Sequence, residues 1–557
     1  MCLDLFADSN TLDTQLLIKN AIHTLPIISF LILLVMMAAC SPEYNPPVET
    51  EVKISIQETS TPSKARPTAT IKLTETPAPV QIESIEIDPL KLQDETVIFW
   101  HSWSGDIREV VDEIVSDFNE SNEWGIEVEA FYQGDPDSID KQVKGALATG
   151  EVPDVVMGYL HQAQEWNEAS ALFDQQVFVD DPVWGFSNEE QEDFYSVFWE
   201  HDVLEGKRLG IPVQRFGQIL LYNESWAQEL GFEGQPKNTD EFKEQACTAY
   251  YANMLDEVDE NDDSGGWIVS TDYSTMLGWI YAFEGQILYS GSPEQDERFY
   301  EFDTPQNEAA FRFLKDLYDD GCAWLPASQI PEEEFASRQG LFSTAHVGDL
   351  KYVREAFQAQ GNYDTWIALP FPSPEEAPAY DVFGPSLYIF SSKLEKQLAS
   401  WLFLKWLTGP EQQAGIIKAA GTLPVRESSM EYLQEYKKQN PQWSQAVSAL
   451  PSARAEPGYP SWKTVRWALG DASRQLFLSY FTIENVPELL KFLDQTAHDL
   501  HLGPVKSGLL DTPTLTPSIT PTASKTPTIT NTQGITPTST PEASSTLTRA
   551  PVISQTP

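Results

Sequence analysis

Aromatic side chains in loops beside predicted strands are the residues of this sequence with the most specific chemistry. Trp103 follows one predicted strand and Tyr159 follows another, while Tyr459 and Trp462 lie in a turn bounded by glycine and proline. The flat C–H faces of sugar rings stack on aromatic rings, and their hydroxyl groups need polar partners that bind in pairs. These loop aromatics therefore predict contact with a ring-shaped, hydroxylated solute, whereas tryptophans within helices are expected to fill the core.

Carboxylates could instead support catalysis, since a glycoside hydrolase needs only two at a suitable distance. The chain has 84 Asp and Glu residues, so chance pairs are inevitable and carry little information. The sequence contains no Gly-x-Ser-x-Gly elbow, no His-Glu-x-x-His and no Walker loop, and its 7 histidines are scattered without metal-ligand spacing. We therefore predict a binding protein that is not an enzyme and uses no cofactor.

The acidic segment from Asp259 to Ser264 resembles a calcium loop only in part. In an EF-hand loop the glycine is sixth and a glutamate is twelfth. Counted from Asp259, Gly265 is seventh and the twelfth residue is Ser270. The pattern therefore predicts a solvated acidic loop, and a bound calcium ion is the alternative.

The charge balance excludes one large class of partner. The chain has 557 residues with 35 Lys and Arg against 84 Asp and Glu, which gives a net charge of −49. Nucleic-acid binders neutralise phosphate with clustered Lys and Arg, so no nucleic-acid partner is predicted. A hydrophobic share of 41% suffices for a large core, and all 16 tryptophans lie between Trp100 and Trp467. We therefore expect the two ends of the chain to contribute little to that core.

The N-terminal segment is typical of an export signal. Residues 21–39 are almost entirely apolar and end in two alanines before Cys40. Such a run predicts a signal peptide over residues 1–39. A cysteine directly after two alanines resembles the lipobox of bacterial lipoproteins, in which the Cys40 thiol would carry a diacylglycerol anchor. An uncleaved membrane anchor is the alternative, and both place the rest of the chain outside the cytoplasm.

Two cysteines remain in the body of the chain, Cys247 and Cys322. Export permits a disulfide between them. Closing a loop of about 75 residues would stabilise the fold by roughly 4–5 kcal/mol in the chain-entropy model. We predict this disulfide, with two buried free thiols as the alternative.

Both ends of the chain have the composition of disordered segments. Residues 40–94 are rich in Pro, Thr, Glu and Ser, and residues 511–557 contain 15 Thr and 8 Pro. Such segments bury too little apolar surface to offset the entropy of ordering. The first is predicted to be a linker after Cys40, and residues 504–557 a solvated tail, with a glycosylated or wall-associated stalk as its alternative.

Strands and helices alternate at the start of the body. Strands are predicted at residues 96–100, 126–132 and 153–158, and apolar residues at helical spacing lie between them. This β-α-β-α-β order implies an α/β fold with a parallel sheet and right-handed crossovers. Ligands bind at the carboxyl ends of the strands in such sheets. Further along the chain we predict a strand at residues 386–390 and a helix that ends before Gly409.

The middle of the chain carries short motifs whose order is more specific than any one of them. The motifs are Phe99-Trp100-His101-Ser102-Trp103, Pro153-Asp154-Val155-Val156, Ile211-Pro212-Val213, Leu221-Tyr222-Asn223, Gly265-Gly266-Trp267, Thr271-Asp272 and Gly421-Thr422-Leu423-Pro424-Val425-Arg426. Together with export, this order resembles the extracellular solute-binding proteins of family 1, the maltose-binding-like components of carbohydrate ABC importers. The Thr/Pro-rich tail departs from that family.

The resemblance implies a two-lobed periplasmic-binding-protein-like fold over residues 95–503, with a hinge and an interlobe cleft. Lobe one would take residues 95–212 and about 376–409. Lobe two would take residues 213–375 and about 410–503.

The resemblance also implies a function and further site residues. The protein would bind a carbohydrate as a monomer, deliver it to ABC permease subunits and be held at the outer face of the membrane by its acyl anchor. Residues that would face the cleft by this resemblance are His101, Gln162, Asp272, Phe383 and Arg426. The alternatives are a binding protein for another solute, such as a polyamine, peptide or phosphodiester, and a sensor or wall-attached protein with the same fold.

Overall fold

A computed structural model describes residues 84–507, except residues 169, 290–298 and 328–329. The predicted signal peptide, the lipidation site at Cys40, most of the linker and nearly all of the Thr/Pro-rich tail lie outside these residues. All described residues belong to one compact unit, Val80–Pro557. Within the described ranges, no helix has the length and apolar character needed to cross a bilayer.

The first sheet has five strands in the order β2-β1-β3-β13-β6. The strands are β1 Thr96–His101, β2 Glu127–Tyr132, β3 Val155–Gly158, β6 Gly210–Pro212 and β13 Ser386–Ile389. β1 pairs in parallel with β2 and β3, while β13 is antiparallel to both β3 and β6. The helices connecting the parallel strands are α3 Asp106–Ser121 and α4 Pro136–Thr149, and α5 Leu160–Asn167 follows β3. The predicted β-α-β-α-β order is confirmed.

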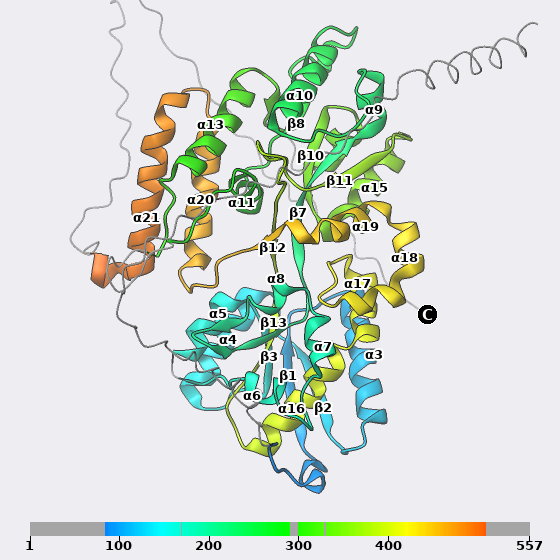
Figure 1. Ribbon diagram of the computed structural model, residues 1–557, viewed down its shortest axis with the longest axis vertical. Coiled ribbons are helices and arrows are strands. Elements are labelled where there is room, and N and C mark those ends of the chain that lie inside the picture. The colour runs from blue at the N-terminus through cyan, green and yellow to red at the C-terminus, as the bar shows by residue number, and fades with distance from the viewer. Residues whose placement is uncertain (1–83, 169, 290–298, 328–329, 508–557) are drawn as a thin grey trace, which may run out of the picture. The chain divides into compact units, whose positions relative to one another are not determined.

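This sheet buries a different cluster on each face. On one face, Phe99 of β1 and Phe118 of α3 both pack edge-on against Phe403 of α16 (Leu394–Leu407), with ring centroids 5.4 Å apart. On the other face, Trp166 of α5 packs against Tyr388 of β13. Figure 1 shows α4 and α5 on one side of the strands and α3 on the other. The sheet is therefore covered on both faces, as parallel sheets are.

The second sheet has the order β14-β12-β7-β10-β8-β9, and β11 also pairs with β7. Its strands are β7 Phe216–Asn223, β8 Gly265–Ile268, β9 Ala323–Trp324, β10 Gly340–His346, β11 Trp366–Leu369, β12 Tyr380–Phe383 and β14 Ala453–Ala455. The principal helices around it are α10 Thr239–Met254, α11 Tyr273–Ala282, α13 Pro305–Asp319, α15 Leu350–Ala359, α19 Pro441–Ser448, α20 Trp462–Leu476 and α21 Val486–Ser507. Shorter elements are η1 Pro89–Leu92, α6 Gln176–Val179, α7 Asn188–Glu192, α8 Ser196–Trp199, β4 Val203–Leu204, β5 Lys207–Arg208, α9 Glu224–Glu229, α14 Pro331–Ala336, α17 Pro410–Ala420, η4 Glu427–Leu433 and α18 Gln434–Gln439.

Over the residues that the structure describes, the chain passes between the two sheets three times. The first passage follows β6, and the second lies at Gly384 and Pro385, between β12 and β13. At Gly384 the backbone has φ 153°, and a Cβ atom there would lie 2.3 Å from the Gln214 carbonyl oxygen of the first passage. Only glycine permits this close approach of the two passages.

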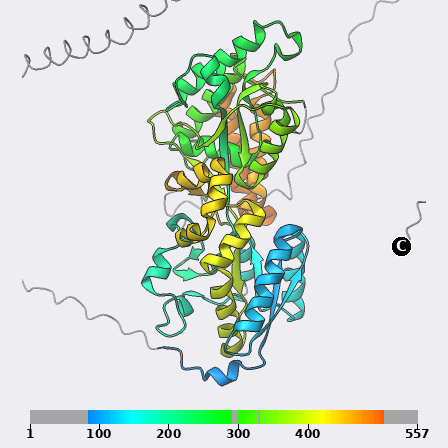
Figure 2. The same cartoon turned by 90° about the vertical axis from the view of Figure 1, so that its right-hand side faces the viewer.

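The third passage runs from α17, which packs on α3, through η4 and α18 to α19, which packs on β11. Figure 2 shows these yellow helices leading from one sheet to the other.

Three predicted boundaries are therefore corrected. The lobe boundary predicted near residue 376 lies at residues 384–385, because β12 pairs with strands of the second sheet. Residues 410–420 stay with the first lobe, because α17 packs on α3. The folded region begins before residue 95, since Ile87 and Leu92 are buried and the backbone N–H of Ile85 donates to Asp181 at 2.7 Å.

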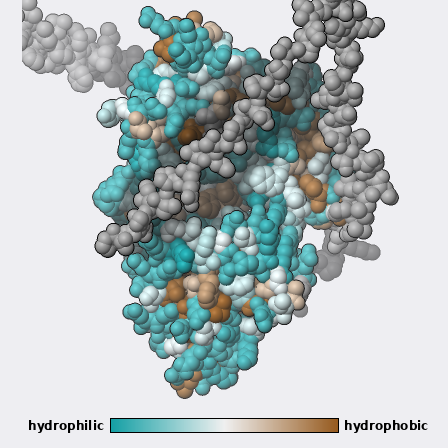
Figure 3. Space-filling model, turned by 180° about the vertical axis from the view of Figure 1, so that it is seen from behind, coloured by the Kyte–Doolittle hydropathy of each residue, from teal (hydrophilic) through white to brown (hydrophobic). Residues whose placement is uncertain are grey.

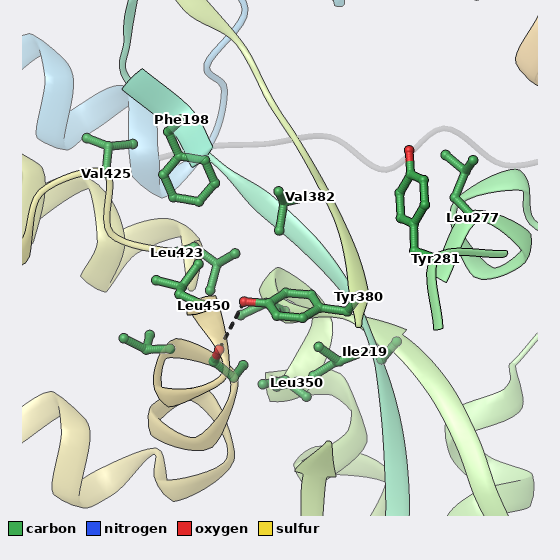
Figure 4. Close-up of a cluster of buried hydrophobic side chains, with 14 of the residues drawn as sticks. Phe198, Ile219, Leu277, Tyr281, Leu350, Tyr380, Val382, Leu423, Val425 and Leu450 are labelled. Carbon is green, nitrogen blue, oxygen red and sulfur yellow. Dashed lines mark hydrogen bonds between the residues drawn. The ribbon is translucent and has the colours of Figure 1, made fainter. Parts of the chain in front are cut away.

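A buried apolar cluster joins β7 and β12 to the passages between the sheets. Figure 4 shows Tyr380 at its centre, with Val425 and Phe198 on one side and Leu350 on another. The Tyr380 hydroxyl donates to the Ala446 carbonyl at 3.1 Å, so its one polar group is satisfied within the cluster.

Figure 3 shows that most of the surface seen from behind is hydrophilic, with separate apolar patches.

The two body cysteines lie on either side of β8. Cys247 of α10 and Cys322, just before β9, are bonded through their sulfur atoms, and Cys322 is buried.

Candidate functional site

Residues at the ends of strands from both sheets line one cleft. From the first lobe, Tyr159 follows the carboxyl end of β3; from the second lobe come Phe216 at the start of β7 and Phe383 at the end of β12. The cleft has a volume of about 370 Å³, within the range of small-molecule sites. Its lining residues are Tyr159, Phe216, His346, Gly348, Asp349, Lys351, Tyr352, Phe383 and Ala420.

Aromatic rings line this cleft from both lobes. Phe216 and Phe383 are stacked with ring centroids 5.6 Å apart, and His346 packs edge-on against Phe383 at 5.4 Å. In the first lobe, Tyr159 is stacked on His161 at 5.6 Å. Burial lowers the pKa of His161 to about 3, so this imidazole is neutral at physiological pH. The cleft thus offers flat, uncharged faces with few polar groups between them.

A second group of side chains lies on α11 and α20. The Arg466 guanidinium lies 5.3 Å from the Tyr273 ring and 5.8 Å from the Trp467 ring, and its Nη1 donates to the Tyr273 hydroxyl at 3.4 Å. Burial raises the pKa of Tyr159 to about 12, and the charges of Glu456 and Arg466 also act on it, so this group lies close to the first lobe.

Sequence reasoning missed Trp467, Tyr273, Phe216 and His346. Trp467 is 58% exposed, whereas the buried face of α20 is formed by Trp462, Val465, Leu469, Ala472 and Leu476. These buried positions follow helical spacing, and Trp467 falls off that stripe. That departure is the signal that could have identified it as a surface residue.

One ion-pair network joins the lobes beside this group. Lys463 of α20 contacts Asp137 at 2.9 Å and Asp140 at 3.2 Å, both on α4 of the first lobe. Asp140 is buried and also accepts hydrogen bonds from Lys144 and from the Trp166 indole. The network therefore holds α20 against α4 in this conformation.

His101 and Trp103, predicted to face the ligand, are buried instead. Trp103 is 3% exposed, and its indole N–H donates to the Gln214 side chain at 2.8 Å. His101 packs between Phe99 and Trp103, and burial lowers its pKa to about 4. The prediction of direct contact is corrected for both residues, because neither has an accessible face. They pack against each other at the carboxyl end of β1.

Gln162 and Arg426 are also corrected, because their polar groups are bound within the protein. The Gln162 amide accepts from the Tyr159 backbone N–H at 2.9 Å and donates to the Pro136 carbonyl at 2.8 Å. Arg426 is buried and donates to Asp193 at 2.6 Å.

Trp462 was predicted to stack on a sugar, but it has no exposed surface in this structure. Its indole N–H donates to Glu456 at 2.6 Å, and its ring packs against Tyr273 and Tyr300. The structure therefore makes it a core residue.

The other predicted residues are accessible in part. Tyr159 and Phe383 line the cleft described above. Asp272 is exposed at the start of α11, where its carboxylate accepts from the Ser274 backbone N–H at 2.8 Å. Tyr459 lines a separate cavity of about 460 Å³, together with Tyr281 and Glu456.

The acidic segment considered for calcium forms a short 3-10 turn, Asp259–Asn261. Among the residues that the structure describes, no group of three or more His, Cys, Asp or Glu side chains is placed to hold a metal ion.

Residues 113–447 match the family described as bacterial extracellular solute-binding protein. A binding protein of Brucella abortus (strain 2308) is 24% identical over 308 residues, which cover 54% of this chain and 70% of that protein. The sn-glycerol-3-phosphate-binding periplasmic protein UgpB of Salmonella paratyphi A is 22% identical over 357 residues, 62% of this chain and 78% of that protein.

The structure of the sugar-binding protein MalE from Xanthomonas citri matches with a TM-score of 0.62 and 20% identity, covering 73% of this chain and 97% of that one. The likeness shows the fold, a two-lobed α/β architecture of the maltose-binding-protein kind.

Proposed function

The chain belongs to the family of bacterial extracellular solute-binding proteins, and we propose that it captures a carbohydrate in its interlobe cleft and delivers it to the permease of an ABC importer. The family match spans residues 113–447, which include strands of both sheets and all three passages between them. The proposed ligand therefore contacts both lobes and stabilises the closed form, which the permease recognises.

The observation that carries the choice of a carbohydrate is the presence of aromatic faces on both sides of one cleft. Tyr159 stands on the first lobe, and the Phe216–Phe383 stack stands on the second. Asp349 and Lys351 at the same cleft supply an acceptor and a donor for hydroxyl groups. Such a pairing of flat apolar faces with sparse polar groups suits a sugar ring.

The charge distribution supports a neutral solute over a phosphate ester, although relatives are named for sn-glycerol-3-phosphate. Lys351 is the cationic residue among those that line the cleft, and the charges of Arg466 and Arg215 act on Tyr159 from nearby. Lys463 is already paired with two carboxylates. Asp272, Asp349 and the buried Glu456 add negative charge beside them. A phosphate dianion would meet repulsion here, whereas hydroxyl groups can donate to the Asp349 carboxylate, which lines the cleft.

Export and anchoring complete the proposal. The signal peptide over residues 1–39 would direct export of the chain. Lipidation of Cys40 would then hold the protein, as a monomer, at the outer face of the membrane. The extracellular character of the family supports this location.

A thermal-shift screen against neutral mono- and oligosaccharides, with glycerol-3-phosphate and polyamines included, tests the proposal. A ligand present at about 100 Kd is expected to stabilise the protein by about 2.7 kcal/mol. The carbohydrate assignment would be contradicted if phosphate esters or polyamines alone stabilise the protein, or if no sugar does.

Replacing Tyr159 by alanine is expected to weaken binding of the sugar identified in that screen by about 10- to 150-fold. The ring is the aromatic face that the first lobe contributes to the cleft, so its loss removes a contact made only with ligand. Tyr480→Ala is the matched control, because Tyr480 is 74% exposed and lies outside the cleft. Isothermal titration calorimetry measures both variants, and equal affinities would remove Tyr159 from the site.

The Cys247–Cys322 disulfide is also proposed for the exported protein. Non-reducing peptide mass spectrometry of protein folded under oxidising conditions is expected to find the two cysteines in one linked peptide pair. Two thiols open to alkylation in that material would contradict the bond.

A further inference from the structure

Asp381 is an acidic residue at a buried position that is unfavourable for a negative charge. It lies on β12, between β14 and β7, and is completely buried. Within the described part of the chain, neither of its carboxylate oxygens accepts a well-formed hydrogen bond. An isolated ionised carboxylate in such a place is strongly unfavourable, so this group must either bind a proton or have a charged partner.

The nearest acidic partner is Glu456, which follows β14 and is 7% exposed. Its backbone N–H donates to the Val382 carbonyl at 3.2 Å, which fixes it beside Asp381. Its two carboxylate oxygens accept from the Trp462 indole at 2.6 Å and from the Ser274 hydroxyl at 3.5 Å. The Asp381 and Glu456 side chains are therefore buried neighbours, and burial, together with the carboxylate of Glu456, raises the pKa of Asp381.

Two ionised carboxylates that are buried side by side repel each other, and neither has a hydrogen to donate. Since both oxygens of Glu456 already act as acceptors, Asp381 is the group that carries the proton. We propose that Asp381 and Glu456 share one proton, and that this pair positions the start of α20, the helix that Lys463 joins to α4 of the first lobe. The consequence for solute capture rests on the proposed function; the shared proton does not.

The charged surroundings of the pair come from several elements. α11 presents Asp272, Tyr273 and Tyr281, α20 presents Arg466, β14 presents Arg454, and the first lobe presents Tyr159. His201 reaches the Glu456 backbone carbonyl at 2.9 Å. On β7, the residue opposite Asp381 is the uncharged Gln218. The charge of Arg466 acts on Glu456, Arg454 lies opposite Asp381 on β14, and Asp272 adds negative charge beside the pair.

The direction of the pH effect follows from these contacts. Burial, with the neighbouring Glu456 and Asp272 carboxylates, raises the pKa of Asp381, and burial raises the pKa of Glu456 to about 7. The folded protein therefore holds a proton that the unfolded chain releases near pH 4. Stability from this proton is present at low pH and is lost as the pH rises through the folded pKa.

Loss of the proton would place two negative charges behind Trp462, the first residue of α20. The charged pair would attract Arg466 and so move the start of α20. Lys463 would move with it, because it is the residue next to Trp462. A shift at the start of α20 would disturb the ion pairs of Lys463 with Asp137 and Asp140, which join α20 to the first lobe. We therefore expect the closed form to weaken as the pH rises.

The test compares the pH dependence of urea unfolding of ligand-free protein between about pH 5 and about pH 8. The variant Asp381→Asn keeps a donor toward Glu456 but has no proton to lose. Relative to this variant, the unfolding equilibrium constant of the wild type is expected to rise by roughly tenfold per pH unit across the titration. Glu456→Gln is expected to shift the titration to lower pH, because one of the causes that raise the pKa of Asp381 is lost. Glu333→Gln, at an exposed carboxylate on α14, is expected to leave the profile unchanged.

Infrared spectroscopy of protein with ¹³C-labelled aspartate gives a second measurement that needs no variant to fold. A protonated carboxyl C=O band that disappears at alkaline pH is expected in the wild type. Absence of this band, a wild-type pH slope retained in Asp381→Asn, or a titration that does not move in Glu456→Gln would overturn the shared proton. If no sugar binds in the screen above, the proposed function fails while these ligand-free measurements still decide the proton.

Discussion

Replacement of Trp462 by alanine is expected to lower the free energy of unfolding by about 3–5 kcal/mol. The side chain is completely buried, packs against Tyr273 and Tyr300, and donates to Glu456 at 2.6 Å. Its removal leaves a large cavity at the start of α20 and deprives the Glu456 carboxylate of a donor. Urea unfolding of the ligand-free protein measures the change.

Trp467→Ala is the matched control for Trp462, since Trp467 lies on the same helix and is 58% exposed. Its replacement is expected to change the free energy of unfolding by no more than about 0.5 kcal/mol, as exposed positions generally do. A Trp462→Ala variant with normal stability and at least tenfold weaker sugar binding would contradict the core assignment and return Trp462 to the binding site.

Replacement of Arg215 by methionine is expected to lower the free energy of unfolding by a similar amount, about 3–5 kcal/mol. Arg215 lies in the first passage between the sheets and is buried. Its guanidinium donates to the Pro385 carbonyl at 2.6 Å, to the Ser386 hydroxyl at 2.9 Å and to Asp202 at 3.1 Å. The substitution leaves Asp202 as a buried charge without its cation.

The double variant Arg215→Met with Asp202→Asn distinguishes a lost charge partner from simple lost packing. The asparagine keeps a polar group for the hydroxyls of Ser386 and Tyr388, which donate to Asp202 in the wild type, and it removes the unpaired charge. The double variant is expected to recover much of the stability lost in the single variant. If the two substitutions destabilise additively, the loss comes from packing and from the hydrogen bonds to Pro385 and Ser386 rather than from the unpaired charge of Asp202.

The sequence by itself determined the class of this protein and the first part of its fold. The β-α-β-α-β order between β1 and β3 could be predicted because it depends on local periodicity, two residues for strands and about 3.6 for helices. The family could be recognised because short motifs kept their order along the chain. Exclusion of nucleic acid followed from composition alone, since phosphate binding needs clustered cations.

Tertiary structure alone decided where the chain passes between its sheets. β12 and β13 are separated by only two residues, yet β12 pairs with β7 and β13 pairs with β3. Both read as short apolar strands, so no local pattern could show that they belong to different sheets. The pairing depends on partners more than 150 residues earlier in the chain, and it moved the predicted boundary from residue 376 to residues 384–385.

The same reason governs the aromatic residues. Trp103 and Trp462 lie in sequence patterns typical of exposed loops, but neighbouring elements cover both rings. The indole N–H of Trp103 donates to Gln214, and that of Trp462 donates to Glu456. Conversely, Phe216 and His346 lie in apolar strands, yet they end at the cleft because the two sheets meet there. Composition and spacing identify side chains able to bind a ring, whereas burial depends on which distant elements pack over them.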